Sequence, residues 1–339
     1  QKVNLFYLIA GVALYVTTVL DLVKTTFSST GGGKLTIFLS GFAWQLLFRM
    51  SGRRGRAKIL PYAGTLAMLL VMGAWILGLW IGFFLLICSD PDSIMNSSTK
   101  EPADVLEKIY YAAFTLSTLG VGDFTATTDH WRILTGIGAF SGLIFFTASI
   151  TYFVPVLSAV GHQTKFCLYL HSMGKSPQQL LVNSWNGTDF SLFFKKATDL
   201  CQMLIQHSLN HHAYPVIHYF HNTSPSLSVA PSVVMLNETV QLLRTVVAEK
   251  AANDPLALTM LQSTLDQYLR VVKDDYMEID AHEDEMPRPN LDALIQSGIP
   301  LREGTFTDAH VLKPFLQRRK LLTNLLVKDG WTWQDVYMD

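Results

Sequence analysis

Three long segments without a single Asp, Glu, Lys or Arg dominate the hydrophobic pattern of this chain. They are Val3–Leu20, Pro61–Cys88 and Ile133–Val160. The second and third are each 28 residues long, whereas about 20 residues cross the ~30 Å hydrocarbon layer of a bilayer. A surface helix of a soluble protein with this length would carry a polar stripe. The pattern therefore predicts an all-α membrane protein with at least three spanning helices.

The first spanning helix, within residues 1–30, is expected to continue to Phe27 in spite of Asp21 and Lys24. These two residues lie three positions apart on one helix face, and we expect them to neutralise each other. A signal peptide does not fit, because the apolar run is too long, no basic region precedes it and no cleavage site of small residues stands out.

Residues 31–60 contain a shorter apolar stretch, Leu35–Met50, followed by a basic loop. Sixteen helical residues reach only ~24 Å, so we interpret the stretch as a helix in the membrane interface, with a short fourth span as the alternative. Arg53, Arg54, Arg56 and Lys58 form the basic loop. The positive-inside rule places this loop in the cytoplasm, where it can also hold anionic lipid headgroups.

The topology of a multi-pass protein of the cell membrane follows from the basic loop. Pro61–Cys88 runs outward, Ser89–Asp104 is external and Ile133–Val160 returns, which makes residues 161–339 a cytoplasmic domain. The N-terminus is outside if Leu35–Met50 does not span the membrane, and inside if it does.

A segment between the two long spans is too short and too mixed to cross the membrane. Ala103–Ser117 has helical spacing, with Asp104 and Glu107 in its first turn, where the helix dipole favours acids. A polar run with alternating glycines, TLGVGD, follows at residues 118–123. Irregular backbone at membrane depth persists only inside protein or beside water, so these carbonyl groups are expected to line a pore.

Residues Tyr110–Asp123, YYAAFTLSTLGVGD, resemble the pore helix and selectivity filter of potassium channels, whose filter reads TVGYG. The resemblance covers about residues 61–160, and that stretch is predicted to be the ion-channel pore domain. It identifies the filter as Thr118, Leu119, Gly120, Val121, Gly122 and Asp123, with K⁺ held at the first four of these positions. It also implies that Tyr110 and Tyr111 support the filter, and Gly142 matches the family's inner-helix glycine hinge. Residues 21–50 are similar to the N-terminal part of a group of bacterial potassium-channel-family proteins.

Known filter chemistry explains why these residue types are needed. Glycine at 120 and 122 permits backbone angles closed to other residues, and we expect Leu119 and Val121 to pack the segment against the pore helix. One chain supplies one quarter of the ring, so the resemblance implies a homotetramer. Val121 occupies the position where Tyr is the commonest residue in the family, although aliphatic residues occur there in some two-pore potassium channels. This difference puts the strength of selection for K⁺ over Na⁺ in doubt. Asp123 is expected to accept a hydrogen bond from the Tyr111 hydroxyl.

Composition agrees with a membrane protein and excludes several other classes. Of 339 residues, 49% are hydrophobic and 16% charged, against roughly 25% charged in soluble domains. The net charge of −1 argues against nucleic acid as a partner. Three cysteines without metal-ligand spacing give neither a disulfide framework nor a metal site.

Residues 161–339 are predicted to form a mostly helical domain that caps the pore, assembles the tetramer or senses an unidentified ligand. Apolar periodicity predicts helices at Asp189–His212, Pro231–Ala252, Pro255–Lys273 and Thr307–Lys328, with Asp189, Ser232 and Asp254 as caps. No strand leads into a GxGxxG loop, and no nucleophile or phosphate-binding motif is present. An enzyme and a cofactor other than the permeant K⁺ are therefore not expected.

Two features of this domain have the composition of sensors. Five histidines, at 207, 211, 212, 218 and 221, lie within fifteen residues and either bind a transition metal, titrate near neutral pH or are simply packed. Acidic residues between Asp274 and Glu285 are interpreted as a linker, because they lack the spacing of a calcium loop.

Gating is expected to come from the cytoplasmic domain, because no span carries Arg or Lys at every third position. Gly142 is a candidate hinge, and close helix packing is the alternative. Pro155 either kinks the helix or marks its end. The sequence thus predicts a potassium-selective channel, with a weakly selective cation channel or a non-conducting, membrane-tethered ligand sensor as alternatives.

Overall fold

The computed structural model describes residues 3–27, 31–276, 289–302 and 309–337. The chain divides into two compact units. The first unit comprises Gln1–Ala43, Leu66–Val156 and Ala213–Pro215, and the second comprises Trp44–Thr65, Leu157–His212 and Val216–Asp339. Helices α2 (Lys34–Met50), α3 (Tyr62–Cys88) and α5 (Asp129–Met173) contribute residues to both units, and so do α7 (Ser191–Ala213) and η1 (Pro215–Tyr219) through Ala213 and Pro215.

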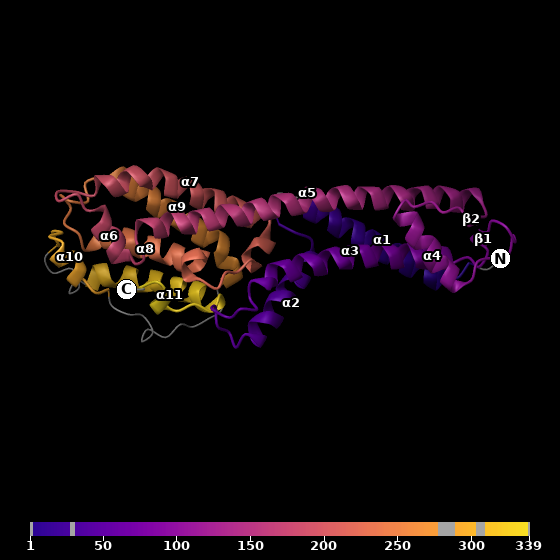
Figure 1. The fold of residues 1–339 in the computed structure, drawn as a ribbon, viewed down its shortest axis with the longest axis horizontal. Helices are drawn as coiled ribbons and strands as arrows, with labels where there is room; N and C mark the ends of the chain where they lie inside the picture. Colours follow the sequence, from indigo (N-terminus) through magenta and orange to yellow (C-terminus); the bar gives the residue numbers. More distant parts are fainter. Residues whose placement is uncertain (1–2, 28–30, 277–288, 303–308, 338–339) are drawn as a thin grey trace. The chain divides into compact units, whose positions relative to one another are not determined.

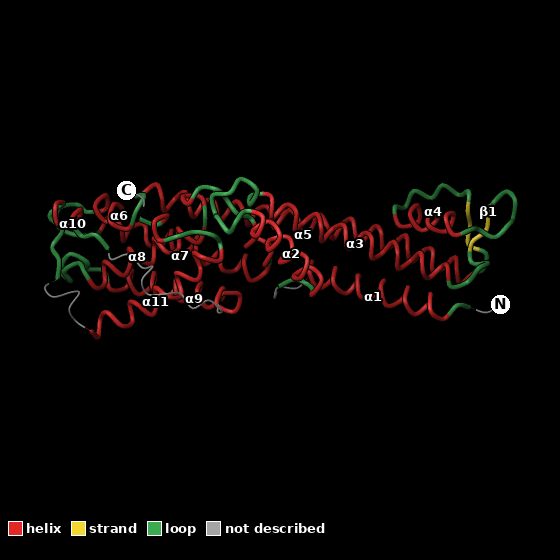
Figure 2. Tube along the Cα trace, turned by 90° about the horizontal axis from the view of Figure 1, so that it is seen from below, coloured by secondary structure: helices red, strands yellow, loops and turns green. Residues whose placement is uncertain are grey.

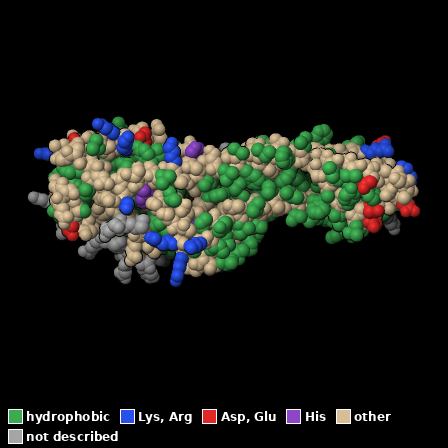
Figure 3. Space-filling model, viewed as in Figure 1, with side chains coloured by type: hydrophobic (Ala, Val, Ile, Leu, Met, Phe, Trp, Pro, Cys, Tyr) green, Lys and Arg blue, Asp and Glu red, His purple; other side chains and the backbone are tan. Residues whose placement is uncertain are grey.

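Three helices in the described part of the chain are long and apolar enough to cross a membrane: α1 (Leu5–Phe27), α3 and α5. They correspond to the three segments for which spans were predicted, so the sequence located the candidate spanning helices correctly. In the first unit, α1 and α3 lie side by side (Figures 1 and 2). Hydrophobic side chains cover the visible face of these helices (Figure 3), as expected for surfaces that meet lipid or other protein rather than water.

Glycines let α1 and α3 approach closely. A Cβ atom on Gly82 of α3 would lie 2.9 Å from the backbone nitrogen of Tyr15 in α1, and one on Gly11 would lie 2.8 Å from the nitrogen of Leu86. In a membrane the hydrophobic effect does not drive helices together, and small residues at the contact allow the close van der Waals packing that does.

Asp21 does not pair with Lys24, so that prediction is wrong. Its carboxylate instead accepts hydrogen bonds from the Leu35 backbone N–H at 2.9 Å, the Thr36 hydroxyl at 2.8 Å and the Trp75 indole at 3.0 Å. The acid therefore lies at the N-terminus of α2, where the helix dipole and free N–H groups favour a negative charge. Helix α2 has 17 residues, and its position in the membrane interface stays a prediction.

A short helix and a two-stranded sheet lie between α3 and α5. Helix α4 (Val105–Leu116) begins at a capping box formed by Asp104 and Glu107, as the acidic first turn predicts. Strands β1 (Ile94–Asn96) and β2 (Phe124–Ala126) pair antiparallel, with Asn96 opposite Phe124. The sequence analysis did not predict this sheet.

Helix α5 passes through Pro155 without a break and continues to Met173. The alternative that Pro155 marks the end of the helix is therefore wrong. The two units divide within this helix between Val156 and Leu157, directly after the proline.

The second unit is helical, as predicted. Its further elements are α6 (Pro177–Ser184), α7 (Ser191–Ala213), η1 (Pro215–Tyr219), η2 (Pro225–Leu227), α8 (Val229–Thr245), α9 (Pro255–Tyr276), α10 (Asp292–Gln296), α11 (Ala309–Lys328) and η4 (Trp333–Asp335). Helix α8 packs against α6, α9 and α11 and is buried along most of its length.

Two of the three predicted helix caps form capping hydrogen bonds at the start of a helix, and the third does not. Asp254 accepts the Ala257 N–H at 2.9 Å, as expected of a cap, and Asp189 accepts the Ser191 N–H at 2.9 Å just before α7. The prediction for Ser232 is wrong, because this residue lies inside α8 and its hydroxyl donates to the Ser228 carbonyl. Hydroxyl side chains satisfy helix carbonyls one turn back as readily as they cap.

Candidate functional site

The segment from Thr118 to Asp123 has an unusual backbone. Thr118, Gly120 and Gly122 have positive φ angles of 58°, 60° and 86°, whereas Leu119 and Val121 do not. The sign of φ therefore alternates along the segment, which is neither a helix nor a strand. Two of the three positions are glycine, which adopts positive φ without a penalty.

The N-terminal end of the segment, at Thr118 and Leu119, is hydrogen-bonded to the C-terminus of α4. The Thr118 N–H donates to the Thr115 carbonyl at 3.0 Å, and the Leu119 N–H donates to the Phe114 carbonyl at 2.9 Å. The segment therefore starts at the negative end of the helix dipole, which favours a nearby cation.

The C-terminal end of the segment, at Gly122 and Asp123, is hydrogen-bonded to Ser97, a residue that the sequence analysis missed. Its hydroxyl donates to the Gly122 carbonyl at 2.7 Å, and its backbone N–H donates to the Asp123 carbonyl at 2.8 Å. Ser97 follows β1, so the pairing of β1 with β2 brings it to the segment. A serine in a polar loop carries no signal of such a role in the sequence.

Leu119 and Val121 do not pack against α4, contrary to expectation. Their side chains are 69% and 50% exposed. A single chain offers the segment one short helix below it and one loop above it, and neither covers these two side chains. The segment thus has apolar groups on its surface that only a neighbouring molecule would bury.

The two tyrosines of α4 have different environments. Tyr111 is buried, and its hydroxyl shares a 2.7 Å hydrogen bond with Thr135 of α5. The expectation that Tyr111 donates to Asp123 is therefore wrong, and it is the hydroxyl of Tyr110 that lies beside Asp123. The Tyr110 ring also packs edge-on against Phe124, the first residue of β2.

Lys108 anchors α4 to the end of α3, and this role was also missed. Its ammonium group is buried and donates to the carbonyls of Asp90 at 2.8 Å and Pro91 at 2.9 Å. A cation that caps carbonyls just beyond a helix C-terminus also matches the sign of the helix dipole.

Gly142 of α5 lies against the end of α4. A Cβ atom at this position would stand 1.7 Å from the Leu116 carbonyl oxygen. A cavity of about 550 Å³ adjoins this contact and is lined by Trp80, Thr118 and Phe146 among others. Close packing thus explains the glycine, and its role as a hinge stays a prediction.

The histidines of the second unit are brought together in part. His207, His211 and His218 line one small cavity with Asp329, whereas His212 is exposed. In the described ranges, no group of three or more His, Cys, Asp and Glu residues is arranged to hold a metal ion. From residue 277 onward, the predicted acidic linker lies outside the described residues.

Comparison with known proteins identifies the region of this site. The ion channel family matches residues 70–159, a range that contains α4, the 118–123 segment and most of α3. The uncharacterized membrane protein YdjJ of Bacillus subtilis (strain 168) is 32% identical over 333 residues, which cover 96% of this chain and 95% of that protein. No solved structure matches the chain.

Proposed function

The chain belongs to the same family as the membrane protein YdjJ and contains an ion channel domain, and on that premise we propose that four copies of it form a potassium-selective channel. The pore of this channel conducts K⁺ passively down its electrochemical gradient. Residues Thr118 to Asp123 of each copy form the selectivity filter.

The alternating φ angles at residues 118–122 carry the proposal. A potassium ion that leaves water needs a set of oxygen atoms that replaces its hydration shell at similar free energy. In the proposed filter the carbonyl groups of Thr118, Leu119, Gly120 and Val121 supply such oxygens, and the positive φ at every second residue supports this assignment. The hydroxyl of Thr118 adds an oxygen at the inner end, close to the negative end of α4.

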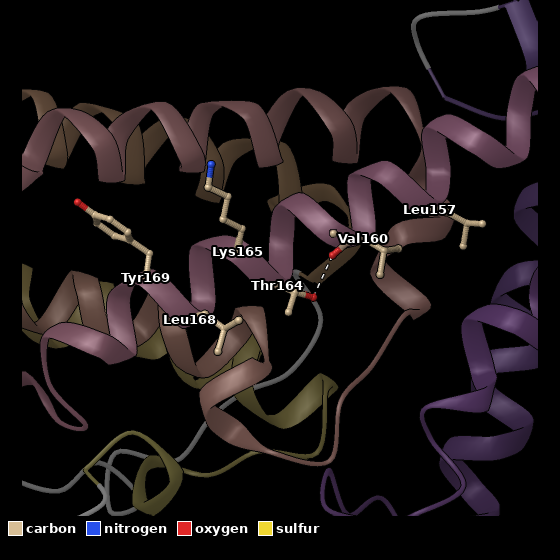
Figure 4. A pocket seen from close by; sticks show the side chains of 7 residues that line it. Leu157, Val160, Thr164, Lys165, Leu168 and Tyr169 are labelled. Carbon is tan, nitrogen blue, oxygen red and sulfur yellow. Dashed lines mark hydrogen bonds between the residues drawn. The ribbon is translucent and has the colours of Figure 1, made fainter.

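Assembly into a ring of four is supported by apolar groups that a single chain leaves exposed. They include Leu119 and Val121 in the filter and extend along α5 beyond it. Figure 4 shows Leu157, Val160, Thr164 and Leu168 along α5, where they line an open groove of about 740 Å³. Leu157 and Leu168 are 57% and 54% exposed, and a cyclic assembly would bury such groups.

The proposed topology has residues 161–339 in the cytoplasm, and α2 in the membrane interface. It is supported by the basic loop at Arg53, Arg54 and Lys58, whose side chains are exposed. The same loop fits anionic lipid headgroups. We further propose that the cytoplasmic unit gates the pore and that K⁺ is the only ion the protein needs.

A weakly selective cation channel is the second candidate, and Val121 favours it. A tyrosine at this position would offer a hydroxyl to hold the filter at one diameter, whereas the half-exposed valine offers none. A filter with fewer lateral ties adapts to ions of different size, and this weakens selection between K⁺ and Na⁺.

Ion flux into liposomes tests the proposal. We expect purified protein to carry K⁺ but not Na⁺, and Gly120→Ala to abolish the flux, because its φ of 60° is costly for alanine. Gly73→Ala is the matched control, since a Cβ there meets no atom within 4 Å. Equal flux of both ions would favour the second candidate, and full flux through Gly120→Ala would contradict the filter assignment.

A further inference from the structure

Polar side chains from several elements of the second unit meet around a small internal cavity of about 30 Å³. They are Gln163 of α5, His207 and His211 of α7, His218 of η1, His221, Asn222 and Ser228 between η1 and α8, Tyr268 of α9 and Asp329 after α11. A space of this size admits about two water molecules.

Asp329 is the acid of this cavity. Its Oδ1 atom has no hydrogen-bond partner, and the Nε2 atom of His218 lies 3.6 Å away. Its side chain is 14% exposed. A carboxylate that gives up water without gaining hydrogen bonds is unstable, whereas a protonated carboxyl group is not.

The charges around Asp329 do not compensate an ionised carboxylate. Burial raises the pKa of Asp329 to about 8, against a small opposing effect of Lys328. Burial also lowers the pKa of His207 to about 3 and that of His218 well below its usual value, helped in both cases by neighbouring His211. The remaining titratable neighbours are Tyr268, near Asp329 and Cys167, and His221, near His218.

These groups define which proton the cavity exchanges. Near neutral pH the side chains of His207 and His218 are uncharged, and the carboxyl group of Asp329 keeps its proton. The first proton to leave as the pH rises is therefore that of Asp329. Histidine protonation would need a pH several units lower, because burial disfavours the imidazolium form.

The cavity adjoins a contact that holds the loop before α3. Asp329 is followed by Gly330, with φ of 76°, whose carbonyl accepts the Gly55 N–H at 2.8 Å. The Gly55 carbonyl lies 2.7 Å from Nε2 of His221, and the His221 ring stacks on Trp331 at 5.3 Å. Both backbone groups of Gly55 are thus hydrogen-bonded to residues beside the cavity. We call Gly55, Gly330, His221 and Trp331 the loop clamp.

Further contacts tie neighbouring parts of the chain to the same place. The Trp44 ring near the end of α2 packs against His218 and His221, with ring centroids 6.2 and 5.6 Å apart. Arg56 donates to Asp335 at 2.7 Å. The held segment leads at Tyr62 directly into α3, so a change in the clamp acts on the start of a spanning helix.

We propose that Asp329 and the surrounding histidines form a proton-binding site, and that the proton in this site keeps the loop clamp closed. When the proton leaves, a negative charge remains in a cavity too small for a hydration shell. The turn at residues 329–331 then moves toward water, and Gly55 loses the Gly330 carbonyl and, because the His221 ring stacks on Trp331, also the His221 imidazole. This proposal goes beyond ion conduction, and its test requires no conducting pore.

Limited proteolysis of the full-length protein in lipid nanodiscs tests the clamp. Arg53 and Arg54 are exposed, and trypsin cuts after them faster when the loop is released. Between pH 7 and pH 9 the ionised fraction of a group with a pKa of about 8 rises about tenfold, so we expect cleavage to rise about tenfold if it follows the ionised form. Rates are normalised to an unstructured reporter peptide, which removes the pH dependence of trypsin itself.

Asp329→Asn removes the charge change and should keep the slow rate at both pH values. Glu249→Gln, at an exposed acid of the same unit, should show the full rise of the unaltered protein. An infrared band of a protonated carboxyl group at pH 7, lost at pH 9 and missing in Asp329→Asn, gives a second reading that does not depend on proteolysis.

Three results would overturn the proposal. They are a cleavage rate independent of pH, an equal rise in Asp329→Asn, or an infrared band that this variant retains. A response to Zn²⁺ at constant pH without a response to pH would identify a metal site instead. Absence of K⁺ flux in liposomes would contradict the proposed function but leave these outcomes unchanged, so the two failures are distinguishable.

Discussion

The Asp21 carboxylate and the Trp75 indole are joined by a 3.0 Å hydrogen bond between α1 and α3. Thr36 and the Leu35 N–H complete the set of donors around the acid. A buried charge is stable only when donors replace its water. The start of α2 is therefore attached to two spanning helices through one acidic side chain.

Asp21→Leu should destabilise the protein by about 2 to 4 kcal/mol, because it leaves three donors without an acceptor, two of them buried. Asp21→Asn, which keeps one acceptor oxygen, should cost less. The midpoint of thermal unfolding, followed by size-exclusion chromatography, measures both. Lys24→Ala is the control, since Lys24 is exposed. An equal loss of stability in Lys24→Ala and Asp21→Leu would contradict this account and support the ion pair predicted from the sequence.

Gly142→Ala should prevent correct packing of α5 on α4, because the new methyl group would overlap the Leu116 carbonyl oxygen. Gly136→Ala on the same helix meets no atom within 4 Å and should be neutral or slightly stabilising, since alanine favours helix. The yield of folded protein compares the two variants. Normal folding of Gly142→Ala with altered gating would instead support a hinge at this position.

Stability of the second unit should be greatest near pH 6.5. The lowered pKa values of His207 and His218 provide stability above their unfolded pKa of about 6.5 that is lost as the pH falls. The raised pKa of Asp329, about 8, provides stability below its unfolded pKa of about 4 that is lost as the pH rises. Between these values the histidines, which include His221 with its lowered pKa, outweigh the carboxyl groups of Asp329 and Glu238, whose pKa values are raised by burial. Above pH 6.5 only these carboxyl groups change the stability as the pH rises further toward 8.

Tryptophan fluorescence during urea unfolding at a series of pH values measures this dependence. Asp329→Asn should reduce the loss of stability on the alkaline side and leave the acidic side unchanged. A midpoint that rises steadily from pH 5 to pH 9 in the unaltered protein would show that these buried groups do not control its stability.

Leu157→Cys should form disulfide-linked multimers in the membrane, because its exposed side chain would face neighbouring copies in the proposed ring. The native Cys88, Cys167 and Cys201 are first replaced by serine. Leu170→Cys, buried on another face of α5, should not cross-link. Denaturing electrophoresis after mild oxidation separates the products, and cross-linking of Leu170→Cys alone would place the contact elsewhere.

Features that depend on local sequence could be predicted. The three spans follow from long runs without charge, and α4 begins where the acidic first turn at Asp104 and Glu107 indicates. The glycines of the filter are visible because their spacing reflects backbone angles that few residues adopt.

Features that depend on distant partners could not be predicted. Asp21 has a possible partner three residues away in Lys24, yet its donors come from Thr36 and Trp75. Ser97 reaches the filter only through the pairing of β1 with β2. Asp329 joins histidines more than 100 positions earlier, and no spacing rule connects residues that tertiary packing alone brings together.

The reversal potential of purified channels in a planar bilayer, with K⁺ on one side and Na⁺ on the other, tests the account most directly. A filter made of the carbonyl groups of Thr118 to Val121 predicts a reversal potential that shifts by about 59 mV for each tenfold change in K⁺ and barely responds to Na⁺. A reversal potential near zero at equal concentrations of the two ions would contradict potassium selectivity.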